Sequence, residues 1–109
     1  MRVRTGRVAV NIGNQLAATG AAPWVDMEAC YGRFSLQTIV TGAPTAVSIT
    51  LEGSNDGVTP FGVALITSTS TTGDTQYAVD KMCQFIRVNL GTLTLGTAPK
   101  VTAFVAVGP

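Results

Sequence analysis

Polar and apolar side chains alternate along most of this chain, and this alternation limits its possible folds more than any other feature. In residues 46–52, Val47, Ile49 and Leu51 are apolar, while the residues between them are polar. Successive side chains of a β-strand point to opposite faces, so this period predicts half-buried strands rather than amphipathic helices. The same pattern predicts strands at residues 7–12, 33–41, 46–52, 61–67, 75–79, 84–90 and 100–107.

Short strands at this spacing predict an all-β fold, a single antiparallel β-sandwich that is either jelly-roll-like or Ig-like. A chain of 109 residues has the size of one domain, so residues 1–109 are expected to form one sandwich with a short basic arm at residues 1–7. A Gly-Ala-Pro turn separates residues 33–41 from residues 46–52. We expect these two segments to pair as a hairpin.

The chain carries few charges for its size. Charged residues make up 12% of the sequence, against about 25% in an average soluble domain. So few charges predict that much of the surface is covered by partner subunits in an assembly. No apolar run approaches the roughly 18 residues that a membrane-spanning helix needs. The net charge of +1 gives no field that attracts nucleic acid, so neither a membrane nor a nucleic acid is expected as a partner.

The sequence offers little catalytic chemistry. It has no histidine, which excludes Ser/His and Cys/His nucleophiles, and its six carboxylates are scattered. Cys30 and Cys83 have no CxxC spacing, and two buried thiols are favoured over a facing pair. We therefore expect no enzymatic activity, no metal ion and no other cofactor.

Residues 52–57, Glu-Gly-Ser-Asn-Asp-Gly, are rich in oxygen ligands but do not have the spacing of an EF-hand. Asn and Asp side chains bond their own backbone, and Gly accepts a positive φ at little cost. The segment therefore predicts a turn rather than a calcium site, with Gly57 in the left-handed region.

Two sets of residues are candidates for binding. A subunit interface would use the arm residues and the last strand, namely Arg2, Arg4, Arg7, Phe104, Val105 and Val107. A glycan site would use aromatic and amide groups in loops at one end of the sandwich, namely Trp24, Asn55, Asp56 and Tyr77. Aromatic rings in a small sandwich, Tyr31 included, are more often core residues or interface anchors. No other small-molecule ligand is expected.

Four motifs follow one another in a distinctive order. They are residues 47–57 (VSITLEGSNDG), residues 85–90 (FIRVNL), a Thr/Gly-rich loop at 91–97 and a final strand with Val-Thr-Ala. This order resembles the small β-sandwich structural proteins of tailed bacteriophages, over residues 24–107. The resemblance implies a non-enzymatic virion protein that decorates or cements the head shell through subunit contacts. It also implies a homo-oligomer, expected to be a trimer, bound to the major capsid protein on the outer surface of the head after synthesis in the host cytoplasm.

The SNDG turn at residues 54–57 and the strand at residues 85–88 are also similar to the discoidin-like jelly roll. Members of that family bind glycans or lipid head groups. This second resemblance implies the alternative function, a fibre or adhesin module that binds a host glycan through loops at the end of the sandwich.

Overall fold

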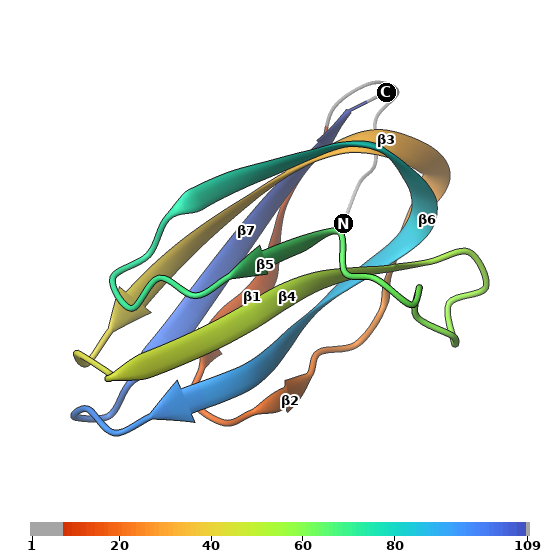
Figure 1. Ribbon diagram of the computed structural model, residues 1–109. Coiled ribbons are helices and arrows are strands. Elements are labelled where there is room, and N and C mark those ends of the chain that lie inside the picture. The colour runs from red at the N-terminus through yellow and green to blue at the C-terminus, as the bar shows by residue number, and fades with distance from the viewer. Residues whose placement is uncertain (1–7, 109) are drawn as a thin grey trace.

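The computed structural model describes residues 8–108, and all of their regular structure is β-strand (Figure 1). This part of the chain contains no helix that could cross a membrane. The all-β prediction is confirmed. The strands are β1 (Val8–Leu16), β2 (Gly20–Ala21), β3 (Val25–Thr41), β4 (Ala46–Ser54), β5 (Ile66–Ser68), β6 (Thr75–Thr94) and β7 (Lys100–Gly108).

The strands form one antiparallel sheet in the order β1-β7-β3-β6-β4-β5, with β2 beside β6. The sheet is folded into two layers because β3 and β6 stay paired as both bend: residues 75–79 of β6 pair with β3 in one layer, and Phe85 and Ile86 pair with the start of β3 in the other. The first layer contains β1, β7, the end of β3 and the start of β6. The second layer contains the start of β3, β2, the rest of β6, which pairs with β4 over residues 85–94, and β4 and β5; Figure 1 shows β4 and β5 in front of β7. The predicted antiparallel β-sandwich is confirmed.

The two long strands curve from one layer to the other at the same end of the molecule (Figure 1). Glu28 in β3 and Asp80 in β6 have φ values of 64° and 61°. The register between the two strands shifts on both sides of Tyr31. Extra residues and left-handed backbone bend a strand and increase its twist. The sequence prediction of separate strands at residues 75–79 and 84–90 is therefore wrong, because the chain bends there without leaving the sheet.

The core lies between the two layers and follows the alternation of the sequence. In β4 and β6 the side chains of Ile49, Leu51, Ile86, Val88 and Leu90 have no exposed surface. Apolar area removed from water stabilises the fold by about 25 cal/mol per Å². The buried cluster consists of Ile12, Met27, Tyr31, Phe34, Leu36, Val47, Ile49, Leu51, Leu65, Ile66, Ala78, Cys83, Ile86, Val88, Leu90, Val101, Ala103, Val105 and Val107.

A polar network joins β3, β5 and the start of β6 at the edge of this core. The hydroxyl of Ser68 donates to Oδ1 of Asp74 over 2.6 Å, and the Asp74 backbone N–H donates to Oγ1 of Thr38 over 3.0 Å. The side-chain amide of Gln76 donates to the other carboxylate oxygen over 3.0 Å. The hydrogen bonds to the carboxylate, from Ser68 first, then from Gln76 and from the Thr38 hydroxyl, hold the pKa of Asp74 below its usual range. The carboxylate therefore stabilises the fold in its charged form.

The expected hairpin between residues 33–41 and 46–52 is wrong. β3 pairs with β6 and β7, whereas β4 pairs with β5 and β6. The turn between β3 and β4 carries the chain from the first layer to the second. Alternation defines the two faces of a strand, but it carries no information about the neighbouring strand.

The strand expected at residues 61–67 is also largely absent, because β5 begins only at Ile66. Phe61 and Leu65 each donate one backbone hydrogen bond to β4, from N–H to the carbonyls of Gly53 and Leu51. Between these two bonds Val63 is 73% exposed, although the alternation predicted an inward side chain. Two isolated bonds hold this segment beside the sheet as a loop.

Candidate interaction surfaces

On the outer side of the first layer, exposed apolar side chains lie among uncharged polar ones over three adjacent strands, and Arg33 borders them beside Val79. The exposed apolar side chains include Tyr77 at 76%, Val79 at 57%, Ile39 at 45% and Phe104 at 37%. We call this surface the uncharged face. It is made of Ser35, Gln37, Ile39, Thr75, Tyr77, Val79, Thr102, Phe104 and Ala106.

The strand register arranges these side chains in rows across the layer. One row runs from Phe104 through Gln37 to Thr75, and the next from Ala106 through Ser35 to Tyr77. Large rings therefore alternate with small side chains. The bulky Tyr77 stands at the end of a row whose other members are among the smallest on the face.

The structure divides the predicted interface residues into three groups. Phe104 lies on the uncharged face. Val105 and Val107 are 1% and 3% exposed, so their side chains belong to the core and are not available to a partner. Arg2, Arg4 and Arg7 lie outside the described residues.

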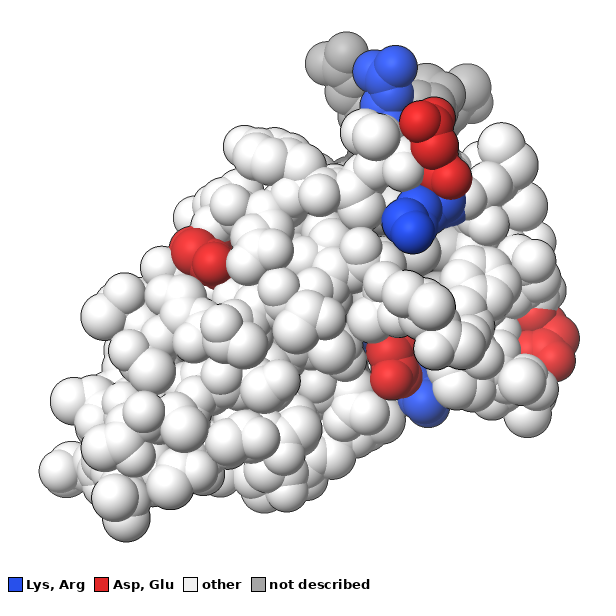
Figure 2. Space-filling view, in the orientation of Figure 1, with Lys and Arg blue, Asp and Glu red and all other residues white. Residues whose placement is uncertain are grey.

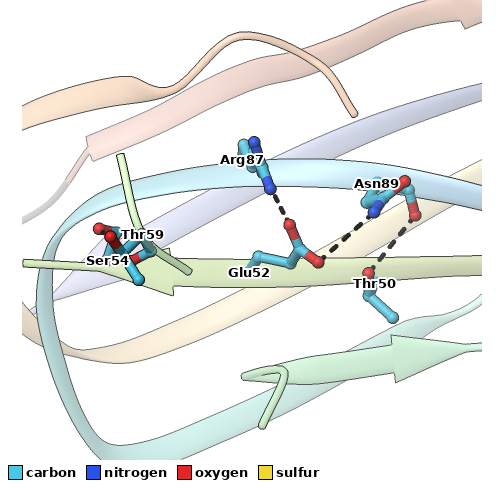
Figure 3. A network of polar contacts seen from close by, with 6 residues as sticks. All are labelled: Thr50, Glu52, Ser54, Thr59, Arg87 and Asn89. Carbon is cyan, nitrogen blue, oxygen red and sulfur yellow. Dashed lines mark hydrogen bonds and ion pairs between the residues drawn. The ribbon is translucent and has the colours of Figure 1, made fainter. Parts of the chain in front are cut away.

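The outer side of the second layer is polar, with four side chains in cross-strand pairs on β4 and β6 (Figure 3). The Arg87 guanidinium donates from Nε to Oε1 of Glu52 over 2.7 Å, and each side chain is about one-fifth exposed. The Asn89 amide donates to Oε2 of Glu52 over 3.5 Å, and the Thr50 hydroxyl donates to the Asn89 carbonyl over 3.4 Å. We call Thr50, Glu52, Arg87 and Asn89 the polar row.

Trp24, just before β3, lies against the polar row. The Arg87 guanidinium carbon is 4.2 Å from the centroid of the Trp24 ring, a cation–π contact. Glu52, Arg87 and Asn89 were not predicted as binding groups. The alternation of the sequence predicts that their side chains point outward. It does not predict that β4 pairs with β6, and this pairing brings the side chains together.

The four predicted glycan residues do not converge on one site. Trp24 lies on the second layer and Tyr77 on the outer side of the first, and Asn55 and Asp56 lie in the turn after β4. The carboxylate oxygen Oδ1 of Asp56 accepts hydrogen bonds within the turn, from the backbone of Thr59 at 2.7 Å and Val58 at 2.8 Å and from the Ser54 hydroxyl at 2.8 Å. These bonds hold the pKa of Asp56 well below its usual range. Gly57 follows with φ at 75°, which confirms the predicted turn.

The cysteines are both free thiols, but only one of them is buried. Cys83 lies in the core, and its burial raises the pKa of the thiol to about 11. Cys30 is exposed, so the expectation of two buried thiols is wrong for Cys30. Among residues 8–108 no three His, Cys, Asp or Glu side chains lie close enough together to hold a metal ion.

The charged side chains are distributed unevenly. Figure 2 shows them mainly toward the end where β3 and β6 curve over, while the opposite end, with the turns before β4 and before β7, is free of charge in this view. The described surface thus offers two distinct regions for recognition, the uncharged face and the polar row beside Trp24.

Comparisons with known proteins identify the fold. No protein-family model matches the sequence, and no curated protein matches it. Among solved structures, the chain is similar to the SPBc2 prophage-derived protein YomS, with 9% identity, a TM-score of 0.63, and coverage of 100% of this chain and 98% of that one. At this identity the likeness shows a shared fold.

The chain is also similar in fold to carbohydrate-binding modules of the CBM32 group. One is CBM32-1 from a family 31 glycoside hydrolase of Clostridium perfringens, with 11% identity, a TM-score of 0.59, and coverage of 94% of this chain and 76% of that one. Another is the CBM32 of AlyQ in complex with 4,5-unsaturated mannuronic acid, with 11% identity, a TM-score of 0.56, and coverage of 93% and 75%. Both likenesses support the β-sandwich architecture.

Proposed function

We propose that this chain is a non-enzymatic structural protein of a bacteriophage virion, one that decorates or cements the outer surface of the head shell. The observation that carries the proposal is the uncharged face, where exposed apolar side chains gather on three adjacent strands. Exposed apolar side chains that gather on one side of a protein often mark a site of interaction. The fold shared with a prophage-derived protein supports a place in a phage particle.

The mechanism is binding rather than chemistry. Subunits that bury apolar surface against one another gain about 25 cal/mol per Å² removed from water, and a shell held at many such contacts resists rupture. In this proposal the partners are further copies of the chain and the major capsid protein. The basic arm at residues 1–7 supplies an additional contact with the shell.

The test is occupancy of purified virions. We expect a copy number comparable to that of the major capsid protein, and shells that rupture at a lower temperature when the protein is absent. A chain lacking residues 1–7 should fold normally and occupy fewer sites, because the arm precedes β1. Only a handful of copies per virion, or no affinity for shells, would overturn the proposal.

A glycan-binding module is the second candidate, favoured by the contact of Trp24 with Arg87 beside Glu52 and Asn89. An aromatic ring next to a carboxylate, a guanidinium and an amide matches the chemistry of sugar recognition. In this candidate the ligand lies over the polar row, and Asn55, Asp56 and Tyr77 take no part.

The chain offers a direct test of this candidate, because Trp24 is its single tryptophan. Titration with neutral and uronic-acid oligosaccharides should change the fluorescence of the Trp24 ring if they bind there. The Glu52→Gln variant should weaken that response, and Tyr77→Ser, on the other layer, should leave it unchanged. An unchanged spectrum with every oligosaccharide would exclude a glycan site at Trp24.

A further inference from the structure

The uncharged face brings four exposed large apolar side chains, Ile39, Tyr77, Val79 and Phe104, to one side of the first layer. We propose that a second copy of this chain covers it, in a face-to-face pair related by two-fold symmetry. The inference rests on the proposed function, in which this face is a contact between subunits, and it names the partner at that contact.

The charge distribution favours a copy of the chain as the occupant. None of the nine side chains of the face carries a carboxylate, an ammonium or a guanidinium group. Two cations border the face: Arg33 pairs with Val79 at one end, and Lys100 lies two residues before Thr102 at the other. Two copies can therefore meet without burying an unpaired charge, and the two cations remain at the solvated rim.

The shape of the face can complement a second copy of itself, because large and small side chains lie at opposite ends of the same row. Tyr77 stands 76% exposed at one end of a row that continues through the small side chains of Ser35 and Ala106. A two-fold axis brings each copy's bulky group against the partner's small ones, because an isologous interface uses the same patch twice. In the proposed pair, Tyr77 of each copy packs over Ser35 and Ala106 of the other. Phe104 in the adjacent row adds a second ring, and aromatic side chains are the usual anchors of such contacts.

The size of the face sets the expected strength of the pair. Three strands about 4.8 Å apart, each contributing five residues at about 3.3 Å per residue, cover roughly 240 Å² in projection. Standard interfaces bury about 800 Å² of accessible surface per partner, and a pleated surface exceeds its projection. We therefore expect a pair at the weaker end of specific complexes, with monomer and dimer exchanging at micromolar concentrations.

Sedimentation of the purified full chain across about 1–500 µM tests the pairing, since mass action shifts a weak dimer over such a range. We expect a species of twice the 11.2 kDa monomer to grow with concentration. Tyr77→Asp and Phe104→Asp should each raise the dimer dissociation constant by more than about 10-fold, because each buries a carboxylate in the interface. Val58→Asp and Val63→Asp are matched controls, since both valines are more than 70% exposed but lie in the loop after β4, and they should have no effect.

A cross-link tests the geometry directly. In a Cys30→Ser background, which removes the exposed thiol, Ser35→Cys and Tyr77→Cys are made as separate proteins and mixed under mild oxidation. A covalent heterodimer of the two variants is expected, and mixing Val58→Cys with Tyr77→Cys should give none. A strictly monomeric chain, a trimer, or equal cross-linking in both mixtures would overturn the pairing.

Shell attachment, measured separately, distinguishes the two proposals. A chain that pairs but does not bind shells would contradict the virion function and leave the pairing intact. A chain that binds shells as a monomer or a trimer would contradict the pairing and leave the virion function intact.

Discussion

Gly57 occupies a position that other residues enter only with strain. Its φ is 75°, and a Cβ built there would lie 3.0 Å from Cε1 of Phe85. We expect Gly57→Val to lower the free energy of unfolding by at least about 1–2 kcal/mol, the left-handed penalty for a residue with a side chain. Asn55→Ser, in the same exposed turn, should change it by less than about 0.5 kcal/mol. Urea denaturation of the two variants measures both effects, and equal midpoints would contradict the left-handed turn.

Asp74 makes the fold sensitive to acid. Its pKa is lowered in the folded state by its bonds to Ser68, Gln76 and Thr38, so the stability that it contributes is present above the unfolded pKa of about 4. That contribution is lost as the pH falls from about 4 through the folded pKa. Asp74→Asn should therefore be less stable than the parent at pH 7, and the difference should shrink as the pH falls below about 4. Thermal melts across this range check the sign, and a constant difference would contradict it.

The turn chemistry of residues 54–57 was readable from the sequence because it is local. Asp56 bonds the backbone two and three residues onward, and Gly57 supplies the positive φ. The contact between Trp24 and Arg87 could not be predicted from the sequence. The two residues are 63 positions apart, and only the pairing of the strands brings them together. Sequence reasoning therefore found the turn and missed the polar row.

At the scale of the strands, alternation predicted faces correctly and neighbours incorrectly. β4 and β7 have nearly the predicted bounds, and the inward residues predicted for β4, Val47, Ile49 and Leu51, are buried. The hairpin of β3 with β4 was wrong because a short Gly-Pro turn can connect two layers as well as two adjacent strands. The bend of β6 at Asp80 was hidden for a related reason: Asp80 and Lys81 interrupt the alternation of polar and apolar residues, yet they continue a strand.

The two faces of β4 differ sharply in what they contribute. Leu51 is fully buried, so we expect Leu51→Ala to lower the free energy of unfolding by about 2–5 kcal/mol through lost burial and a cavity. Thr50 is its outward neighbour, with one hydroxyl bond of 3.4 Å, and Thr50→Ala should cost less than about 0.5–1 kcal/mol. Chemical denaturation of both variants provides the comparison. Similar losses would mean that the outward face of β4 is covered in solution.

At the scale of the whole molecule, low charge should make association insensitive to salt. The uncharged face offers apolar and hydrogen-bonding groups, and salt screens only charge–charge interactions. Raising NaCl from about 0.05 to 0.5 M, which shortens the Debye length severalfold, should change the dimer dissociation constant by less than about 3-fold and release little protein from shells. Sedimentation and pelleting of shells at both salt concentrations measure this. Release by salt would instead assign the attachment to the charged residues.

β3 and β6 run through both layers, so a force that pulls the two layers apart acts on continuous backbone at the curved end of the sandwich. Two separate sheets would offer only side-chain packing there. The opposite end is closed by turns and by hydrogen bonds such as those from Thr45 N–H to the Thr94 carbonyl and from Thr97 N–H to the Gly42 carbonyl. The two turns at that end, before β4 and before β7, also join one layer to the other. Continuous backbone therefore bridges the layers at both ends of the sandwich, and a force that pulls them apart should meet resistance at each.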